Sequence, residues 1–158
     1  MGSAALSDTG AARSVRDWAI GGVFGNWVQV TDGRMKYARA PHDDNFPLSM
    51  WSNRWSTMPV HVKGFNELPK PDSRAWLDRM PGSEIPVIRQ PFAPGDFLPF
   101  WAYGTKPDEH LLHDLDTDPW QTRDLAGEPG EKEAIDLLRA ALDDVEAPAE
   151  QYERLGLA

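Results

Sequence analysis

The chain has 158 residues, of which 41% are hydrophobic, and it carries a formal net charge of -9. This length predicts one domain with a modest core, and the excess of acid argues against nucleic acid or an anionic membrane as a partner. The chain has no cysteine, which excludes disulfides and thiolate metal sites but leaves the compartment undecided.

Residues 1–14 are predicted to form a flexible leader, followed by a domain that covers residues 15–158. The leader, MGSAALSDTGAARS, has no long apolar run, so neither a signal peptide nor a transmembrane helix is expected in it. Leu6 occupies the position where a myristoylation signal needs Ser or Thr. We therefore expect no membrane anchor, and the cytoplasm is the default location.

The segment from Trp18 to Arg39 predicts a three-strand antiparallel meander. Gly25-Asn26 and Asp32-Gly33 are both dipeptides that favour two-residue hairpin turns. Such turns place three pairs of residues opposite one another: Val23 with Val28, Val28 with Tyr37, and Val30 with Met35. One face of the sheet is then apolar throughout, as a buried face requires.

The opposite face of this predicted sheet carries four large apolar side chains before it becomes polar, namely Trp18, Ile20, Phe24 and Trp27. So much aromatic surface is not left in water, and we expect another part of the chain or another domain to cover it. Whether this aromatic face is covered by the chain itself or by another domain distinguishes two hypotheses about function, given below.

Residues 41–107 are predicted to form a long irregular insertion, because proline recurs throughout and interrupts both helices and sheets. Only residues 73–80, SRAWLDRM, have the form of a helix, with Asp72 or Ser73 as the cap. The insertion also contains tryptophans, which are expected to be core side chains rather than a platform for sugar or aryl ligands; they are Trp51, Trp55, Trp76 and Trp101.

After the insertion, Leu111–Leu115 predicts a short strand. It is followed by a sequence with the form of a capping box: Asp118 is the expected N-cap, Pro119 stands where a missing N–H costs nothing, and Gln121 reaches back to the N–H of the cap. We therefore expect a capped helical turn directly after this strand.

The sequence from Glu131 to Val145 predicts an amphipathic helix with an acidic first turn that suits the helix dipole. A last turn is expected around Tyr152. The stripe that packs on the sheet is predicted to consist of Ile135, Leu138, Leu142 and Val145. The predicted fold class is α+β: a small antiparallel sheet, made of the three-strand meander and the later strand, packed by the C-terminal helix and interrupted by the irregular insertion.

Three aspartates after the predicted strand and a basic hairpin are the candidates for metal and anion sites. Asp114, Asp116 and Asp118 have the spacing that opens an EF-hand calcium loop, but Pro119 and Leu125 stand where that loop needs its turn glycine and its bidentate glutamate. Turn chemistry accounts for these carboxylates, and the four histidines predict no zinc site. An anion site is disfavoured because no helix N-terminus or glycine-rich nest accompanies the basic residues of the hairpin, Arg34, Lys36 and Arg39.

Segments of the chain resemble one protein family. Residues 109–126, EHLLHDLDTDPWQTRDLA, are similar to the "LYDLxxDPxExxNL" signature of type I sulfatases in the alkaline phosphatase-like superfamily, with His113, Gln121 and Asp124 in place of Tyr, Glu and Asn. Residues 26–39, NWVQVTDGRMKYAR, resemble the "VTDGRYKYIRYP" hairpin that precedes this signature, and Pro41 continues the match. The stretch TMPVH, residues 57–61, is similar to an "MPTH" element of one sulfatase subgroup.

The resemblance implies the carboxy-terminal subdomain of a sulfatase-like hydrolase, whose parent enzyme cleaves a sulfate ester with a calcium or magnesium ion. The family makes its formylglycine from Cys or Ser in a C/S-x-P-x-R motif, which this chain lacks. The nearest likeness has Thr57 at the modified position and His61 in place of Arg. We therefore expect no catalytic residue here and a sulfatase-like catalytic domain as the partner. Thr57 and His61 remain candidates for the substrate pocket.

Two alternatives are kept. One is a free-standing binding module with an aromatic-lined surface for a glycan or a protein partner. That hypothesis gains if the chain's own middle segment covers Trp18, Phe24 and Trp27, whereas an open apolar patch favours a missing catalytic domain. The other is an autonomous hydrolase that uses His61 with Asp43 or Asp44; it ranks last because no nucleophile stands at a supporting spacing.

Overall fold

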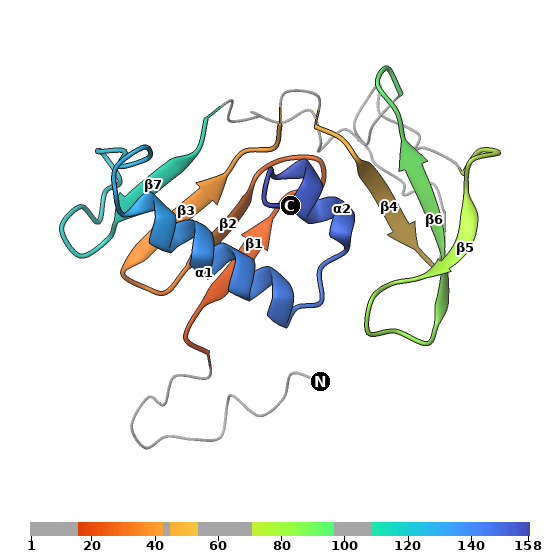
Figure 1. Cartoon of the computed structure of the whole chain (residues 1–158), viewed down its shortest axis with the longest axis horizontal. Helices are drawn as coiled ribbons and strands as arrows, with labels where there is room; N and C mark the ends of the chain where they lie inside the picture. Colours follow the sequence, from red (N-terminus) through yellow and green to blue (C-terminus); the bar gives the residue numbers. More distant parts are fainter. Residues whose placement is uncertain (1–15, 43–44, 54–70, 97–108) are drawn as a thin grey trace, which may run out of the picture.

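The computed structural model describes residues 16–42, 45–53, 71–96 and 109–158, and these residues confirm the α+β fold class (Figure 1). They form two antiparallel sheets and two helices. The first sheet has the strand order β1-β2-β3-β7, with β1 (Ala19–Gly22), β2 (Val28–Thr31), β3 (Met35–Arg39) and β7 (Leu111–Asp114). It is the predicted three-strand meander with the later strand added beside its last member.

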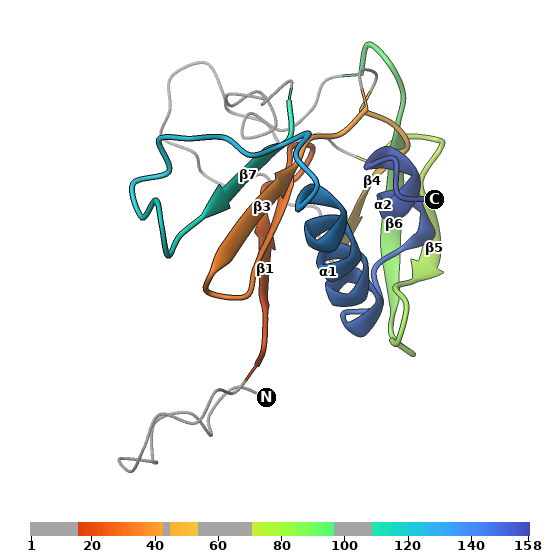
Figure 2. The ribbon, with the colours of Figure 1, turned by 60° about the vertical axis from the view of Figure 1, so that its left-hand side comes forward.

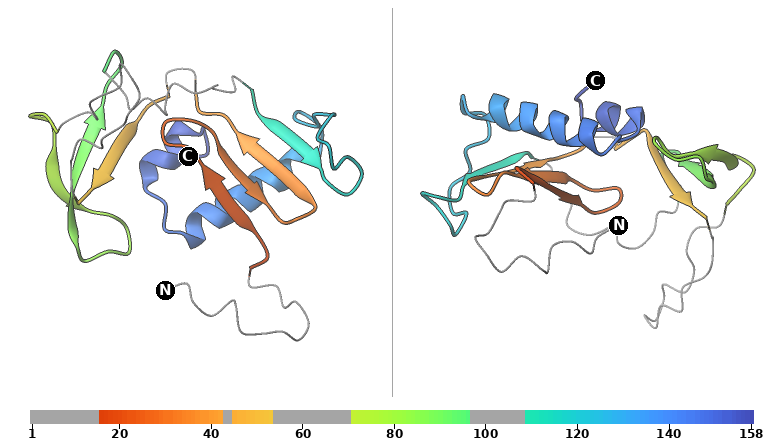
Figure 3. Two further views of the ribbon diagram at one scale, coloured as in Figure 1. Left: turned by 180° about the vertical axis from the view of Figure 1, so that it is seen from behind. Right: turned by 90° about the horizontal axis from the view of Figure 1, so that it is seen from below.

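Helix α1 (Glu131–Asp144) crosses one face of this sheet, in contact with β1, β2 and β3 (Figure 3). The short helix α2 (Ala149–Arg154) follows and contacts β4, so that it lies between the two sheets (Figure 2). Both helices were predicted at nearly these positions. No helix within the described ranges is long and apolar enough to cross a membrane.

The second sheet corrects the prediction of an irregular insertion. Its strands are β4 (Leu48–Ser52), β6 (Pro86–Phe92) and β5 (Trp76–Arg79), in that order. Prolines in a central strand argued against a sheet, but β6 is central only over part of its length. Pro91 pairs with Ser49 beyond the end of β5, and Pro86 pairs with Arg79 beyond the end of β4. Among the described residues, each proline is thus paired with only one neighbouring strand, so these positions are at the edge of the sheet, where proline is tolerated.

The predicted helix at residues 73–80 is wrong. Ala75 donates its N–H to the carbonyl of Asp72 at 3.1 Å, and the Asp72 carboxylate accepts the N–H of Arg74 at 2.8 Å. Asp72 therefore organises a turn, after which β5 pairs with β6 from Trp76 to Arg79. Pairing with a neighbouring strand outweighs the local helical pattern, as tertiary contacts commonly do.

The register at the Asp32-Gly33 turn differs from the prediction. Val30 lies opposite Tyr37 and Thr31 opposite Lys36, so residues 32–35 form the turn in place of a two-residue loop. The Asp32 carboxylate accepts the N–H groups of Met35 at 2.7 Å and Arg34 at 2.9 Å. These bonds stabilise the wider loop. A shift by two positions keeps every side chain on its predicted face, which is why the apolar face survives the error.

The register at the Gly25-Asn26 turn is wrong by one position, and this changes which face is aromatic. Gly22 lies opposite Val28, where Val23 was expected, and Ile20 lies opposite Val30. A shift by one residue moves a whole strand to the other face. Ile20 and Trp18 therefore pack on the core beneath α1 and not on the outer face.

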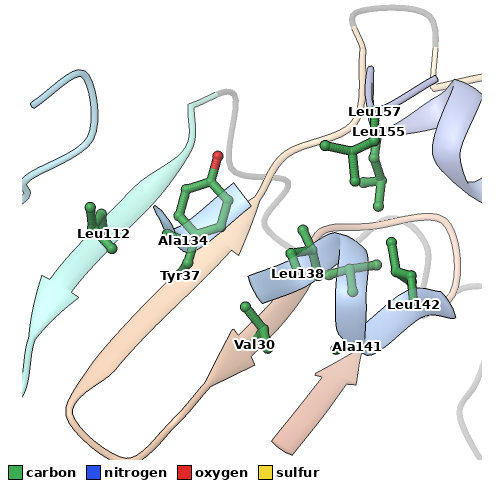
Figure 4. Packing of buried hydrophobic residues seen from close by; sticks show 10 residues of the cluster. Val30, Tyr37, Leu112, Ala134, Leu138, Ala141, Leu142, Leu155 and Leu157 are labelled. Atoms are coloured by element: carbon green, nitrogen blue, oxygen red, sulfur yellow. The ribbon is translucent and has the colours of Figure 1, made fainter. Parts of the chain in front are cut away.

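The hydrophobic core lies between α1 and the four-stranded sheet (Figure 4). Val30, Tyr37 and Leu112 come from three neighbouring strands and belong to one cluster with the fully buried Leu138 of α1. The predicted stripe is partly right: Leu138 and Leu142 are buried and Ile135 packs beside them, whereas Val145 is exposed at the helix end. The remaining buried members are Val28, Ala134, Ala141, Leu155 and Leu157.

Candidate functional site

The predicted substrate-pocket residues Thr57 and His61 lie outside the described residues. The same is true of Asp43 and Asp44, the partners considered for His61, and of two of the predicted core tryptophans, Trp55 and Trp101. The part of the chain that the structure describes therefore leaves these predictions as they stand. The remaining predicted motifs lie in the first sheet.

The two predicted motifs around Asp32-Gly33 and Asp118-Pro119 meet at one end of the four-stranded sheet. The N–H of Leu115 donates to the carbonyl of Arg34 at 2.6 Å. Lys36 on β3 donates through Nζ to Oε1 of Gln121 at 2.8 Å. The hairpin and the turn after β7 are thus one structural unit, although they are far apart in the sequence.

Asp118 does not cap a helix, so the capping-box prediction is wrong. The N–H of Gln121 donates to the carbonyl of Asp118 at 3.0 Å, which closes a turn at Pro119. The Asp118 carboxylate accepts the N–H of Arg123 at 2.8 Å and the hydroxyl of Thr122 at 3.1 Å. The Arg123 N–H is the main cause that lowers the pKa of Asp118. Gln121, with a φ of 55°, points its side chain to Lys36 instead of back to the cap.

The chain turns back after Asp118 because the outer edge of β7 needs partners. Asp124 Oδ1 accepts the N–H of Leu112 at 2.8 Å, and Leu125 donates its N–H to the carbonyl of Leu112 at 2.8 Å. Both backbone groups of Leu112 on this side are thereby paired, although Leu112 is buried at a sheet edge. The end of the motif, at Asp124 and Leu125, therefore protects the outer edge of β7.

This edge contact predicts a contrast between two substitutions at Asp124. Asp124→Ala leaves the Leu112 N–H without its acceptor, and we expect it to lower the free energy of unfolding by about 1–2 kcal/mol. Asp124→Asn retains an oxygen at the same place and is expected to change stability by less than about 0.5 kcal/mol. Urea unfolding of both variants measures the difference. Equal losses in the two variants would show that charge, and not the hydrogen bond, is what matters.

A cluster of polar side chains that the sequence did not predict surrounds Tyr37. We call it the Tyr37 cluster and define it by Tyr37, Arg39, His110 and Glu131. The Tyr37 hydroxyl donates to Oε1 of Glu131 at 2.8 Å and accepts from Nη1 of Arg39 at 3.0 Å. Arg39 also donates through Nε to the carbonyl of Leu155 at 2.9 Å. The cluster joins β3, the start of α1 and the C-terminal segment.

Burial sets the electrostatics of the Tyr37 cluster. It raises the pKa of the Tyr37 hydroxyl to about 12, so this phenol is protonated at neutral pH. Burial also acts to raise the pKa of Glu131, but hydrogen bonds from the Gly127 N–H and the Tyr37 hydroxyl outweigh it, and the net pKa is lowered. The cluster therefore holds a carboxylate, a guanidinium and a neutral phenol in one hydrogen-bonded chain.

His110 lies beside the Tyr37 ring, with ring centroids 6.2 Å apart, and its Nδ1 accepts the N–H of Ala40 at 3.1 Å. Burial is the main cause that lowers its pKa below 6.5, and the charges of Arg39 and His42 act in the same direction, whereas Glu131 opposes them. The neutral ring then carries its proton on Nε2, because Nδ1 is an acceptor.

The lowered pKa of His110 predicts a loss of stability in mild acid. As the pH falls through 6.5, the unfolded chain takes up a proton that the folded protein resists, so the free energy of unfolding decreases. His110→Asn keeps an acceptor for Ala40 but does not titrate. We expect its melting temperature to fall less than that of the wild type between about pH 7.5 and about pH 5.5.

The control for this experiment is His42→Gln, which removes an exposed histidine. The charge of His42 is a minor cause of the lowered pKa of His110, and burial is the main one, so this variant is expected to keep most of the pH dependence of the wild type. A decrease of the same size in the wild type and in His110→Asn would remove His110 as the cause.

A second unpredicted arrangement lies on one face of the three-stranded sheet. Arg89 on β6 is opposite both Trp51 and Trp76, and its guanidinium lies 4.7 Å and 5.0 Å from the centroids of their rings. It also forms ion pairs with Asp78 at 3.2 Å and with Glu150 of α2 at 2.6 Å. Trp51 and Trp76 therefore hold the guanidinium between them. The prediction that they are core side chains is wrong for Trp76, which is 44% exposed.

Neither arrangement had a sequence signal strong enough to find it. The members of the Tyr37 cluster come from segments far apart in the chain, and only the pairing of β3 with β7 brings them together. Arg89 stands in a segment with two prolines, PVIRQPF, that did not read as a strand. Val87, Arg89 and Pro91 are spaced two residues apart, and this spacing is the one local feature of the segment that is typical of a strand.

The described residues do not fit a metal site of the calcium or magnesium kind. Within them, no group of three or more His, Cys, Asp or Glu side chains is placed to hold a metal ion. The carboxylate of Asp114 accepts the N–H groups of Asp116 and Thr117, and that of Asp118 faces Thr122 and Arg123. These oxygens close turns in the backbone and do not converge on a common point.

Comparisons of the chain with protein-family models, with curated proteins and with solved structures found no match. What the chain does is therefore inferred from its own residues. Its main features are the joined motifs of the first sheet, the Tyr37 cluster and the stacked Arg89.

Proposed function

We propose that this chain is the carboxy-terminal unit of a sulfatase-like hydrolase and acts together with a catalytic domain. One observation carries the proposal. The two segments that resemble the family form adjacent strands, with Tyr37 opposite Leu112 and Met35 opposite Asp114. They also share the contacts between Leu115 and Arg34 and between Lys36 and Gln121. Two matching motifs that build one unit support a common origin more strongly than two scattered matches.

The chemistry of the described residues agrees with a supporting role. Hydrolysis of a sulfate ester needs a strong nucleophile and positive charge at the group that is transferred. The phenol of Tyr37 is protonated at neutral pH, and Arg39 donates to Tyr37 and to the carbonyls of Leu155 and Gly156. By resemblance, the formylglycine and the metal belong to the catalytic domain.

The isolated chain is expected to have no sulfatase, phosphatase or phosphodiesterase activity. Purified protein is assayed on an aryl sulfate and an aryl phosphate, with calcium or magnesium added. The coding sequence directly upstream is read for a domain with the C/S-x-P-x-R motif. If such a domain is present, the joined protein is expected to hydrolyse the aryl sulfate after formylglycine formation.

Two results would contradict this proposal. One is turnover by the isolated chain that survives a second purification and disappears in His61→Ala, which would make the chain a hydrolase in its own right. The other is an upstream sequence without such a domain, or a joined protein that carries the formylglycine and has no sulfatase activity.

A free-standing binding module is the second candidate, and a specific contact favours it. The ring of Phe24 packs on Phe92 of the middle segment, with centroids 6.0 Å apart, while Trp18 packs on the core beneath α1. Of the three rings that separate the two hypotheses, Phe24 is therefore packed by the middle segment, whereas Trp18 is packed by the main core. Titration with oligosaccharides, followed by tryptophan fluorescence, tests this candidate. A saturable response of the wild type supports it, and no response favours the sulfatase-like unit.

A further inference from the structure

The three-stranded sheet lies outside the main hydrophobic core. Every member of the core cluster within the described residues comes from the four-stranded sheet, from the helices or from the segments that flank them. The second sheet has its own buried positions, Leu48, Ser49, Gln90 and Phe92. A unit that shares little apolar surface with the core can open at a lower free energy than the core itself.

One carboxylate accepts hydrogen bonds from three side chains of this sheet. Glu150 on α2 accepts Arg89 Nη2 at 2.6 Å and Ser49 Oγ at 2.9 Å through Oε2, and Trp51 Nε1 at 3.3 Å through Oε1. The Glu150 side chain is only 14% exposed. Hydrogen bonds to a charged acceptor in such a site are stronger than those to a neutral one.

The contact at Arg89 reaches all three strands. Arg89 lies on the central strand β6, stacks between Trp51 of β4 and Trp76 of β5, and pairs with Asp78 of β5. A bond between Glu150 and Arg89 therefore holds the sheet as a whole. A second set of contacts lies just before β4, where Asn45 donates to the carbonyl of Gly25 at 2.8 Å and accepts from Arg154 at 2.8 Å. These bonds fix the start of β4 to the first sheet.

We propose that the three-stranded sheet is a separately opening unit of the fold and that the Glu150 carboxylate is the latch that holds it closed on α2. Opening separates Phe92 from Phe24 and uncovers Trp51, so it exposes apolar surface that the closed state hides. This device rests on the described contacts alone and is independent of the proposed function.

Hydrogen exchange followed by mass spectrometry tests the proposal on the whole chain. In the wild type, amides of β4, β5 and β6 are expected to exchange together and faster than those of β2, β3 and α1. Glu150→Gln keeps the shape of the side chain and removes its charge. It is expected to increase exchange in the three strands on the order of tenfold, with no change in the first sheet.

Glu153→Gln, an exposed change on the same helix, is the matched control and is expected to leave all rates as they are. Ser49→Ala removes one donor to Glu150 and is expected to give a smaller increase in the same strands, which keeps the test valid if Glu150→Gln unfolds. Equal exchange of the two sheets in every protein would show one cooperative unit and overturn the proposal. Unchanged exchange in both Glu150→Gln and Ser49→Ala would show that Glu150 is no latch.

Discussion

Arg154→Leu is expected to lower the free energy of unfolding by about 3 kcal/mol, because it leaves buried acceptors without a donor. Arg154 is 2% exposed and donates through Nη1 to the carbonyl of Asn26 at 2.9 Å and to Oδ1 of Asn45 at 2.8 Å. Burial lowers its pKa to about 10, so the guanidinium is still charged at neutral pH. Loss of this group frees the β1–β2 loop and the start of β4 together.

Thermal unfolding at neutral pH measures this effect, and a decrease in melting temperature of roughly 5–10 °C is expected. Arg123→Leu is the matched control, since Arg123 is exposed and its side chain forms an ion pair with the exposed Glu128 in the loop after β7. It is expected to change stability by less than about 1 kcal/mol. Replacement of a buried charge by an apolar side chain is sometimes stabilising. If Arg154→Leu raises the melting temperature, the hydrogen bonds to Asn26 and Asn45 do not offset the cost of burying the charge.

Leu138→Ala is expected to destabilise the fold by about 3 kcal/mol, within the range for leucines in well-packed cores. Leu138 is fully buried where α1 crosses the sheet (Figure 4). The substitution removes apolar contacts with Val30 and Tyr37 and leaves a cavity, because the surrounding strands are held in place by their ladders. Urea unfolding is expected to give a lower midpoint with an unchanged slope.

Leu77→Ala provides the same chemical change at an exposed position. Leu77 lies on β5 and is 71% exposed, so the expected loss is within about 0.5 kcal/mol. A loss at Leu77 as large as that at Leu138 would mean that β5 is covered in solution, and a small loss at Leu138 would place the core elsewhere.

Several features of the fold followed from the sequence by local physics. The period of apolar residues in 131–144 specified α1, and the short apolar run at the start of Leu111–Asp114 favoured a strand. The four strands of the first sheet and the packing of α1 on one of its faces were also predicted. These properties depend mainly on side chains within one segment, so they can be predicted from the sequence of that segment.

The errors lie where distant parts of the chain decide the outcome. At the Asp32 loop, hydrogen bonds to Arg34 and Met35 and the bond from Leu115 to Arg34 select a wider turn than the dipeptide predicts. After Asp118, the unpaired edge of Leu112 draws the chain back and prevents the helical turn. In both cases the local preference is on the order of 1 kcal/mol, which is less than the contacts that oppose it.

The fold class, the strands of the first sheet and the amphipathic helix were predictable from local patterns, as was the resemblance that motivates the proposed function. Three features were not: the second sheet of β4, β5 and β6, the packing of Trp18 and Ile20 on the core, and the meeting of Tyr37, Arg39, His110 and Glu131. The physical reason is the range of the interactions. Periodicity and turn preference act over a few neighbouring residues, whereas strand partners, register and buried polar networks depend on which distant segments bury their surfaces together.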